Sequence, residues 1–551
     1  VLIPLLGVKQ TIEIGVLFNG LLGLSIFFLD KKFSIRWRII FVAVFILLGI
    51  GYKIQYPEWN KHIAISGVFR GLFVDVPPTF EEFKSHDEAN RTILSYKEGV
   101  NANVAVIEIP TESSTQRTLI INGKADASTE GDLQTQILLA QVPLMMLPDT
   151  GDALVIGLGS GITCGSALVH PLRSLDCVEI SSEVVDAVHY FGKWNNDVIK
   201  NPRLKLHLDD AITYLKITPK QYDFIISEPS NPWIAGIGNL FSSEFFELSK
   251  KRLRPGGILT QWFHTYDLDD QTFKLIMNTI CRAFPYVSIW RASDADVIIL
   301  ASVKPMKADF GMMEKKLRIK AIEDDLARIQ IYDIPTFLST QVVSSRNNIF
   351  SFMGGEINSE KKPLLEFMAP IGLFTHSAVQ IVDSLDERLI VQDKNLWISM
   401  YEKQYGLSLM NYLNIARYRN NANIGDLWFA YSTLKKCLQL SPRSEDALGM
   451  MARVTRDLGL KDERLDILRR VAELFPDDVE VVNVYAEALL DHYAQHISVV
   501  NNLELQDVID LYRHCIALTG GKDERFFIML GGSLRIAGKC AEAAEIYKNV
   551  L

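Results

Sequence analysis

A glycine-rich turn, residues 157–161 (GLGSG), follows directly on the apolar run DALVI and constrains the fold more than any other feature of this sequence. Glycine permits a sharp backbone turn and the close approach of a ligand. The motif alone is also compatible with a purely structural turn. Around it, short β-type runs alternate with helical segments. This alternation predicts an α/β domain with a Rossmann-like, doubly wound parallel sheet.

The pattern along the chain of 551 residues divides it into five parts. Strand-like runs separated by turn residues precede the α/β alternation and predict a small β-sheet domain, whereas strand signals end after it. The expected parts are transmembrane helices at 1–55, a small β-sheet domain at 56–131, a Rossmann-like nucleoside-binding catalytic domain at 132–305, an irregular extension packing on the catalytic domain at 306–384, and tetratricopeptide-like helical repeats at 385–551.

The first 55 residues are apolar enough to enter a membrane. Residues 11–29 carry one charge, Glu13, and are long enough to span, whereas residues 39–52 are short for a span. Two buried core helices are the alternative. We expect a membrane location, in a bacterial inner membrane, with this chain as the C-terminal part of a longer protein. The basic loop at 31–38 favours an outward catalytic domain by the positive-inside rule, but we leave its side open.

Helical repeats are indicated by two prolines, Pro442 and Pro476, which close similar helical stretches 34 residues apart. Thirty-four residues is the tetratricopeptide period, and the final segment GGSLRIAGKCAEAAEIYKNVL resembles a further unit. Such arrays offer a concave surface to a protein partner. A helical packing domain without a partner is the alternative.

Charge and cysteine content exclude two classes of function. The net charge of −9 argues against nucleic-acid binding. The six cysteines are scattered without the close spacing of a metal or redox site, so we predict no metal.

Three acidic residues follow successive predicted strands, where ligands bind in open α/β sheets. Glu179 lies 18 residues after Gly161 and suits the hydroxyls of a ribose. Asp210 suits the amine of adenine, although it can equally be a helix N-cap, for which Asp209 is the better candidate. Glu228, in IISEPSNPW, can hold a cationic amine and accept its proton. In the same loop Asn231 offers hydrogen bonds, and Trp233 can form a wall of the pocket.

These motifs, taken in order, resemble the spermidine synthase (polyamine aminopropyltransferase) family, and most closely its membrane-bound branch. The resemblance covers about 300 residues and is carried by ISGVFRGLF, IINGKADASTEGD, QTQILLAQVPL, ALVIGLGSGIT, VEIS, SEPSNPWIAGIGNLFSSEFFEL, LRPGGILTQWF and NSEKKPLLEFMAP. It implies transfer of an aminopropyl group from decarboxylated S-adenosylmethionine to a small amine substrate, and a homodimer.

Functional residues are carried over from the family by position. The resemblance implies that Gln136 and Glu179 bind the donor, that Asp210 contacts adenine, and that Glu228 replaces the catalytic aspartate. The glycines of the turn, Gly157, Gly159 and Gly161, complete the implied donor site. Gln261 and Tyr266 are expected to line the acceptor pocket with Asn231 and Trp233.

Ile162 stands where the family pattern has a further glycine, and three other departures concern groups that hold charged amines. Ser160 stands at a usual aspartate, Asn231 at a second aspartate, and Thr135 at a usual tyrosine. The nucleoside half of the site is therefore retained while the amine half is altered. This puts a simple diamine acceptor in doubt, because an unpaired buried ammonium is costly.

Three functional hypotheses follow from these features. The first is a spermidine synthase-like aminopropyltransferase. The second is a methyltransferase that uses S-adenosylmethionine itself, favoured by the serine at position 160. The third is a non-catalytic nucleoside-binding membrane sensor or scaffold. A dehydrogenase has no support beyond the glycine turn.

Overall fold

The structure is a computed structural model that describes residues 2–29, 33–55, 59–67, 79–111, 114–148, 151–347, 355–384, 396–421, 425–495 and 504–548. Part of the motif ISGVFRGLF, residues 68–73, and part of the basic loop, residues 31 and 32, lie outside this range. The chain forms two compact units. Unit 1 comprises 1–330 and 340–397, and unit 2 comprises 331–339 and 398–551.

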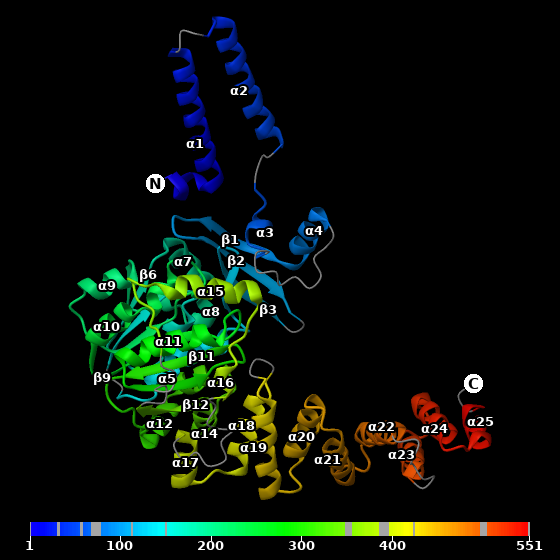
Figure 1. Cartoon of the computed structure of the whole chain (residues 1–551). Helices are drawn as coiled ribbons and strands as arrows, with labels where there is room; N and C mark the ends of the chain where they lie inside the picture. The colour runs from blue at the N-terminus through cyan, green and yellow to red at the C-terminus, as the bar shows by residue number, and fades with distance from the viewer. Residues whose placement is uncertain are drawn as a thin grey trace. The chain divides into compact units, whose positions relative to one another are not determined.

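Two long apolar helices begin unit 1 (Figure 1). They are α1 (Leu2–Leu29) and α2 (Ile35–Gln55). Spans of 25 and 21 residues within them, Leu5–Leu29 and Ile35–Gln55, are long and apolar enough to cross a membrane. Length and composition alone do not separate a membrane anchor from a signal sequence, which passes the same test. The second span is longer than the 14 residues expected from the sequence, because the helix continues through polar residues at both ends.

A four-stranded antiparallel sheet follows the short helices α3 (Lys61–Ala64) and α4 (Phe80–Asn90). Its strands pair in the order β1 (Thr92–Glu98), β2 (Asn103–Pro110), β3 (Thr115–Ile121) and β4 (Lys124–Ser128). Glycine and asparagine lie in the turns that join β1 to β2 and β3 to β4, as the sequence pattern predicts. The structure thus contains a small β-sheet within unit 1, and its strand β4 carries charged side chains that line the site described below.

The central sheet has eight strands in the order β12-β10-β11-β9-β8-β5-β6-β7. These strands are β5 (Asp152–Ile156), β6 (Ser174–Glu179), β7 (Leu204–Leu208), β8 (Tyr222–Ser227), β9 (Leu253–His264), β10 (Tyr286–Arg291), β11 (Asp296–Ser302) and β12 (Gln341–Asn347). Strands β5 to β9 pair in parallel, whereas β10, β11 and β12 pair antiparallel. The expectation of a parallel sheet is corrected to a mixed one. Only four residues join β10 to β11, too few for a crossover helix.

Helices cover both faces of this sheet. The crossovers through α6 (Ile162–Leu168) and α10 (Ser243–Arg252) run in opposite directions from β5 and β8. Because such crossovers are right-handed, they place these helices on opposite faces. The remaining helices up to residue 283 are α5 (Leu133–Leu144), α7 (Ser182–Ala187), α8 (Gly192–Asn195), α9 (Ala211–Ile217) and α11 (Asp270–Ala283).

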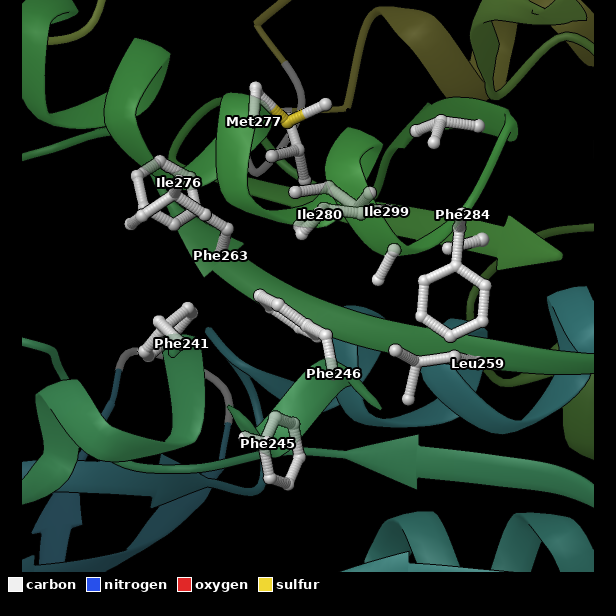
Figure 2. Close-up of a cluster of buried hydrophobic side chains, with 14 of the residues drawn as sticks. Phe241, Phe245, Phe246, Leu259, Phe263, Ile276, Met277, Ile280, Phe284 and Ile299 are labelled. Carbon is white, nitrogen blue, oxygen red and sulfur yellow. The ribbon is translucent and has the colours of Figure 1, made fainter. Parts of the chain in front are cut away.

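An aromatic-rich core lies between β9, β11 and the helices α10 and α11 (Figure 2). The cluster contains Phe245 and Phe246 of α10 and Leu259 and Phe263 of β9, with Ile276 and its neighbours on α11 completing it. Each fully buried side chain of this size contributes about 1.5–3 kcal/mol by leaving water. This packing fixes the strands whose carboxyl ends carry the site.

An ion-pair network lies at the opposite, amino-terminal edge of the sheet, where the Asp152 carboxylate is buried and the arginine side chains are partly exposed. Asp152 of β5 accepts hydrogen bonds from Arg173 and, at 2.6 Å, from Arg254. Arg254 also pairs with Asp223 of β8. The Arg173 guanidinium is the main cause that holds the pKa of Asp152 well below its usual range, against the effect of burial. The network stabilises one edge of the sheet and leaves the other available for a ligand.

Residues 306–384 contain α12 (Phe310–Leu317), α13 (Lys320–Ala327), α14 (Ile334–Leu338), α15 (Leu364–Thr375) and α16 (Ile381–Ser384). They also supply β12, which extends the central sheet beyond β10. Residues 331–339, with α14, group with unit 2 instead. The expected irregular extension is thus largely helical, and one of its strands is part of the sheet.

Unit 2 is helical. After α17 (Trp397–Tyr405) its helices are α18 (Leu409–Arg419), α19 (Leu427–Leu440), α20 (Glu445–Asp457), α21 (Lys461–Leu474), α22 (Val479–Gln495), α23 (Glu504–Leu518), α24 (Glu524–Ile536) and α25 (Cys540–Lys548). From α18 onward each helix packs against the next one in the chain. Helices α19 and α21 begin 34 residues apart, as do α20 and α22, which agrees with the period read from the sequence.

Candidate active site

A cavity of about 540 Å³ lies at the carboxyl ends of β5, β6 and β8, under the hairpin of β3 and β4. Strands β6 and β7 extend the sheet on one side of β5, and β8 and β9 extend it on the other. The cavity therefore occupies the point where strand order reverses, the usual ligand-binding position in open α/β sheets.

The glycine turn forms the floor of this cavity, where Gly157 and Gly159 line it directly. Gly157 has a φ of 94°, and a Cβ there would lie 2.4 Å from the carbonyl oxygen of Glu228. Only glycine fits this position. Gly161, with a φ of 77°, is the N-cap of α6 and lies behind the lining, against Val188. The turn therefore brings the ends of β5 and β8 together, and two of its three glycines face the cavity.

Glu179 ends β6 and projects into the cavity while remaining 8% exposed. Its two carboxylate oxygens accept backbone N–H groups of Leu158 and Ser181, each at 2.9 Å. Burial raises the pKa of Glu179 and these backbone hydrogen bonds oppose the rise. The side chain is thereby fixed beside the glycine turn, with oxygen lone pairs left for the hydroxyls of a ligand.

Asp210 lines the cavity but also caps α9, since its Oδ1 accepts the N–H of Thr213 at 2.8 Å. The prediction that Asp209 would be the cap is therefore wrong. Asp209 lies one residue too early and instead accepts the N–H of Asp210 at 2.8 Å. Asp210 is exposed at the rim, where one oxygen holds the helix and the other can face a ligand.

Glu228 follows β8 and lines the centre of the cavity. Its Oε2 lies 2.6 Å from the hydroxyl of Thr163, which is also 3.1 Å from the carbonyl oxygen of Gln136. Burial is the main cause that raises the pKa of Glu228 to about 8. The nearby carboxylates of Asp132 and Asp296 add to the rise, and the hydrogen bond from Thr163 opposes it. A carboxyl with such a pKa can exchange a proton with a ligand near neutral pH.

Gln136 and Ser160, both buried, contact each other beneath Glu228. The Ser160 hydroxyl donates to the side-chain oxygen of Gln136, and the amide of Gln136 donates to the carbonyl of Ser128 at 2.9 Å. Both residues line the cavity. The side chain of Gln136 is thus held in place by neighbours from the turn and from β4.

The residues expected at the acceptor end are only partly at the cavity surface. Tyr266 lines it, with its hydroxyl 3.3 Å from the buried amide of Asn231, which supports Tyr266 from behind. Trp233 is buried outside the lining. Gln261 is also buried away from the cavity, and Trp262 lines it instead. Successive side chains of a strand face opposite sides, so the assignment of Gln261 is corrected to its neighbour on β9.

Four charged lining residues were not assigned a role from the sequence: Lys124, Asp126, Asp132 and Asp296. The indole of Trp262, at 3.1 Å, and the hydroxyl of Thr135, at 2.8 Å, both donate to Asp296. Burial and the nearby Asp132 raise the pKa of Asp296 to about 6. The sequence does contain a pattern that points to Lys124 and Asp126. In β4 (KADAS) the charged residues alternate with alanines, and such alternation indicates that the charged side chains share one face of the strand.

Acidic groups dominate the cavity. Seven carboxylates line it: Asp126, Asp132, Glu179, Asp209, Asp210, Glu228 and Asp296. Lys124 is the one basic side chain among the described lining residues. Such a lining attracts cationic molecules. Within the described part of the chain, no group of three or more His, Cys, Asp or Glu residues is arranged to hold a metal ion.

The fold and this cavity define a Rossmann-like α/β domain with an acidic pocket beside the glycine turn. Residues 133–307 match the family model described as the spermine/spermidine synthase domain. The α/β domain of this chain is therefore similar to that family, and the match and the relatives below indicate a transferase of the aminopropyltransferase class. Among the three hypotheses drawn from the sequence, the comparisons favour the first.

Similar proteins include a spermidine synthase from Coffea arabica, 30% identical over 214 residues, which are 38% of this chain and 66% of the relative. A spermine synthase from Arabidopsis thaliana is 27% identical over 253 residues, which are 42% of this chain and 70% of the relative. The alignment thus spans about two thirds of these relatives. Among solved structures, a spermidine synthase from Thermotoga maritima covers 45% of this chain and 86% of its own, at 20% identity and a TM-score of 0.36.

Proposed function

We propose that this chain is a membrane-anchored, spermidine synthase-like aminopropyltransferase that uses decarboxylated S-adenosylmethionine as donor and an amine as acceptor. The observation that carries the proposal is Glu228, a carboxyl with its pKa raised to about 8, in the same cavity as the glycine turn and Glu179. The family match of the surrounding domain supports the class of reaction.

In the proposed reaction Glu228 is the catalytic base. It takes a proton from the acceptor ammonium, and the freed nitrogen lone pair attacks the donor carbon next to the sulfonium. The carbon–sulfur bond breaks, and its electron pair goes to sulfur, leaving neutral methylthioadenosine. The amine is uncharged only after this proton transfer. A base whose pKa lies near the pH of the medium is therefore well matched to the step.

The donor site in this proposal is built from the glycine turn and the acids at neighbouring strand ends. Glu179 accepts the ribose hydroxyls, Asp210 contacts adenine, and Gln136 orients the donor chain beside Glu228. Gly157 and Gly159 bring the backbone against the nucleoside, while Gly161 shapes the turn. At the acceptor end Tyr266 and Trp262 line the pocket, and Asn231, Trp233 and Gln261 support them from behind.

Calorimetric titration combined with product analysis tests the proposal. The full chain is titrated with decarboxylated and ordinary S-adenosylmethionine, and a panel of amines is then added while methylthioadenosine is quantified. We expect donor binding and amine-dependent release of methylthioadenosine. Donor binding without release for every amine would instead support a non-catalytic nucleoside-binding protein, and S-adenosylhomocysteine as product would support methyl transfer.

We propose that α1 and α2 anchor the domain in a membrane, because their apolar faces are largely exposed within the chain. Extraction of membranes with alkaline carbonate should leave the full chain in the pellet and release a chain that starts at residue 59. Protease protection of intact membranes would then assign the side of the catalytic domain. Recovery of the full chain in the soluble fraction would contradict an anchor.

For unit 2 we propose tetratricopeptide-like repeats that bind a protein partner, on the basis of the 34-residue offset between successive helix pairs. A partner captured by the full chain but not by a chain that ends at residue 421 would support this role. On the basis of the family resemblance we also propose a homodimer. Sedimentation velocity on the detergent-solubilised chain would test this proposal.

A further inference from the structure

Lys124 is unusual among the residues of the cavity because it places a buried ammonium in a pocket that otherwise collects carboxylates. Its side chain is 4% exposed and lines the cavity from the first residue of β4. The ammonium nitrogen lies 2.5 Å from Oδ1 of Asp126 and 5.9 Å from the centre of the Trp233 ring. A desolvated cation at such a position is retained at considerable cost in free energy.

The carboxylate of Asp126 is engaged by groups of the protein itself. Oδ1 accepts from Lys124 and, at 2.8 Å, from the hydroxyl of Ser230, which also lies 3.0 Å from Oδ2. Burial is the largest single effect and opposes the charged form of Lys124. The charge and hydrogen bond of Asp126, together with the nearby Tyr266 and Asp132, exceed it and keep the pKa of the lysine above its ordinary value. Asp126 could otherwise pair with an ammonium group of a ligand, but here it pairs with the ammonium of Lys124.

The remaining hydrogen-bonding capacity of Lys124 points to the chemistry of the ligand. An ammonium has three N–H donors and no acceptor. Among the described residues Asp126 is the acceptor that Lys124 reaches. Because Lys124 lines the cavity, its remaining donors suit an oxygen of a ligand better than a second ammonium.

We propose that Lys124 is a specificity-determining residue whose ammonium donates a hydrogen bond to an oxygen of the ligand. The amine substrate is then a monoamine with a hydroxyl or carboxylate at its far end rather than a diamine. This inference rests on the proposed aminopropyl transfer and names its substrate class. The same oxygen chemistry has a second source, the α-carboxylate of an S-adenosylmethionine donor that has not been decarboxylated. The reaction itself is unchanged in either case, since the oxygen is not at the reacting carbon.

The test compares acceptors of equal length in the full chain. Methylthioadenosine release is measured with 1,4-diaminobutane, 4-amino-1-butanol and 4-aminobutanoate, each with decarboxylated and with ordinary S-adenosylmethionine. We expect kcat/KM for one of the oxygen-bearing acceptors to exceed that for the diamine at least about tenfold, the value of one charge-assisted hydrogen bond. If the rate depends on which donor is used and not on which amine is used, the oxygen bound by Lys124 is the carboxylate of the donor.

Substitution of the lysine provides the second arm. Lys124→Met removes the ammonium and frees Asp126, so the preference should reverse, with the oxygen-bearing reactant losing about 10- to 100-fold and the diamine gaining. Asp126→Asn keeps the ammonium and should keep the preference for oxygen. Lys97→Met removes an exposed lysine that pairs with Asp186 outside the cavity, and it should change nothing. Thermal unfolding of each variant verifies that it is folded.

The outcomes separate this inference from the proposed function. Suppose that methylthioadenosine is released, that the diamine is preferred, and that Lys124→Met leaves the ratio of kcat/KM between the amines unchanged. This result would overturn the role of Lys124 while supporting aminopropyl transfer. No release with any pair would overturn the transfer. In that case calorimetry with the same molecules still decides the inference: tighter binding of oxygen-bearing molecules that is lost in Lys124→Met supports it, and equal binding in both proteins refutes it.

Discussion

The hydroxyl of Thr163 lies 2.6 Å from Oε2 of Glu228, and this contact joins the helix after the glycine turn to the proposed catalytic base. The same hydroxyl is 3.1 Å from the carbonyl oxygen of Gln136. A hydroxyl has one hydrogen to donate, so it cannot serve both acceptors at once. When Glu228 is protonated it can donate to Thr163, which then donates to Gln136. When Glu228 is ionised, Thr163 turns to donate to the carboxylate.

Glu228→Gln should abolish turnover and leave donor binding intact. Glutamine keeps the shape of the side chain and can still bond to Thr163, but it cannot accept the proton of the acceptor ammonium. We expect kcat for methylthioadenosine release to fall by about 10²–10⁴-fold, the usual contribution of a general base. Calorimetry should show an unchanged affinity for the donor. Glu247→Gln, on the partly exposed side of α10 outside the cavity, serves as control. Unchanged turnover in Glu228→Gln would remove this residue from its role.

The pH dependence of turnover should report the raised pKa of Glu228. The base is active when ionised, so kcat should rise as pH increases through about 8, the pKa of this carboxyl in the folded chain. The Thr163 hydrogen bond lowers that pKa. Thr163→Val therefore moves the rising limb to higher pH, by about one pH unit if the bond is worth 1.5 kcal/mol. An unmoved limb in Thr163→Val would mean that another group, such as the acceptor amine, sets the profile.

Much of this site could be predicted from the sequence because it depends on strand ends. The glycine turn, Glu179 and Glu228 each follow an apolar strand, and parallel strands bring their carboxyl ends to one edge. The family match to residues 133–307 agrees with the resemblance read from the same motifs.

The parts that sequence reasoning missed depend on which face of a strand a side chain takes. Gln261 and Trp262 are neighbours, and only the pleat of β9 decides which of them reaches the cavity. Lys124 and Asp126 come from the separate β4 hairpin, so their position over the carboxyl edge is a tertiary property. The antiparallel β10–β12 strands were missed for a similar reason, because strand direction depends on the length of the connection.

Glu179→Gln should weaken donor binding. The carboxylate accepts two backbone N–H groups and, in the proposed complex, the ribose hydroxyls as well, whereas an amide offers one acceptor oxygen. We expect the dissociation constant for the donor to rise about 10- to 100-fold, as measured by calorimetry. Asp209→Asn makes the same change of charge in the same cavity without a proposed ligand contact, and its effect should be much smaller. Equal losses in the two variants would indicate a general electrostatic effect instead.

Gly157→Ala should destabilise the domain and impair the site together. The residue has a φ of 94°, and its new Cβ would meet the carbonyl oxygen of Glu228 at 2.4 Å. We expect a loss of about 2–4 kcal/mol of stability together with reduced turnover. Gly449→Ala is the matched control: this helical glycine has no neighbouring atom within 4 Å of a new Cβ. Its replacement should raise helix stability by about 0.5–1 kcal/mol. Calorimetric unfolding of the two variants should therefore give shifts of opposite sign.

An experimental structure of the full chain with methylthioadenosine bound is the most direct measurement of the central claim, that the acids at adjacent strand ends form one nucleoside site beside a base. We predict the ribose hydroxyls within hydrogen-bonding distance of Glu179, the adenine at Asp210 and the sulfur turned toward Glu228. A nucleoside bound elsewhere, or turned so that its sulfur faces away from Glu228, would contradict the account.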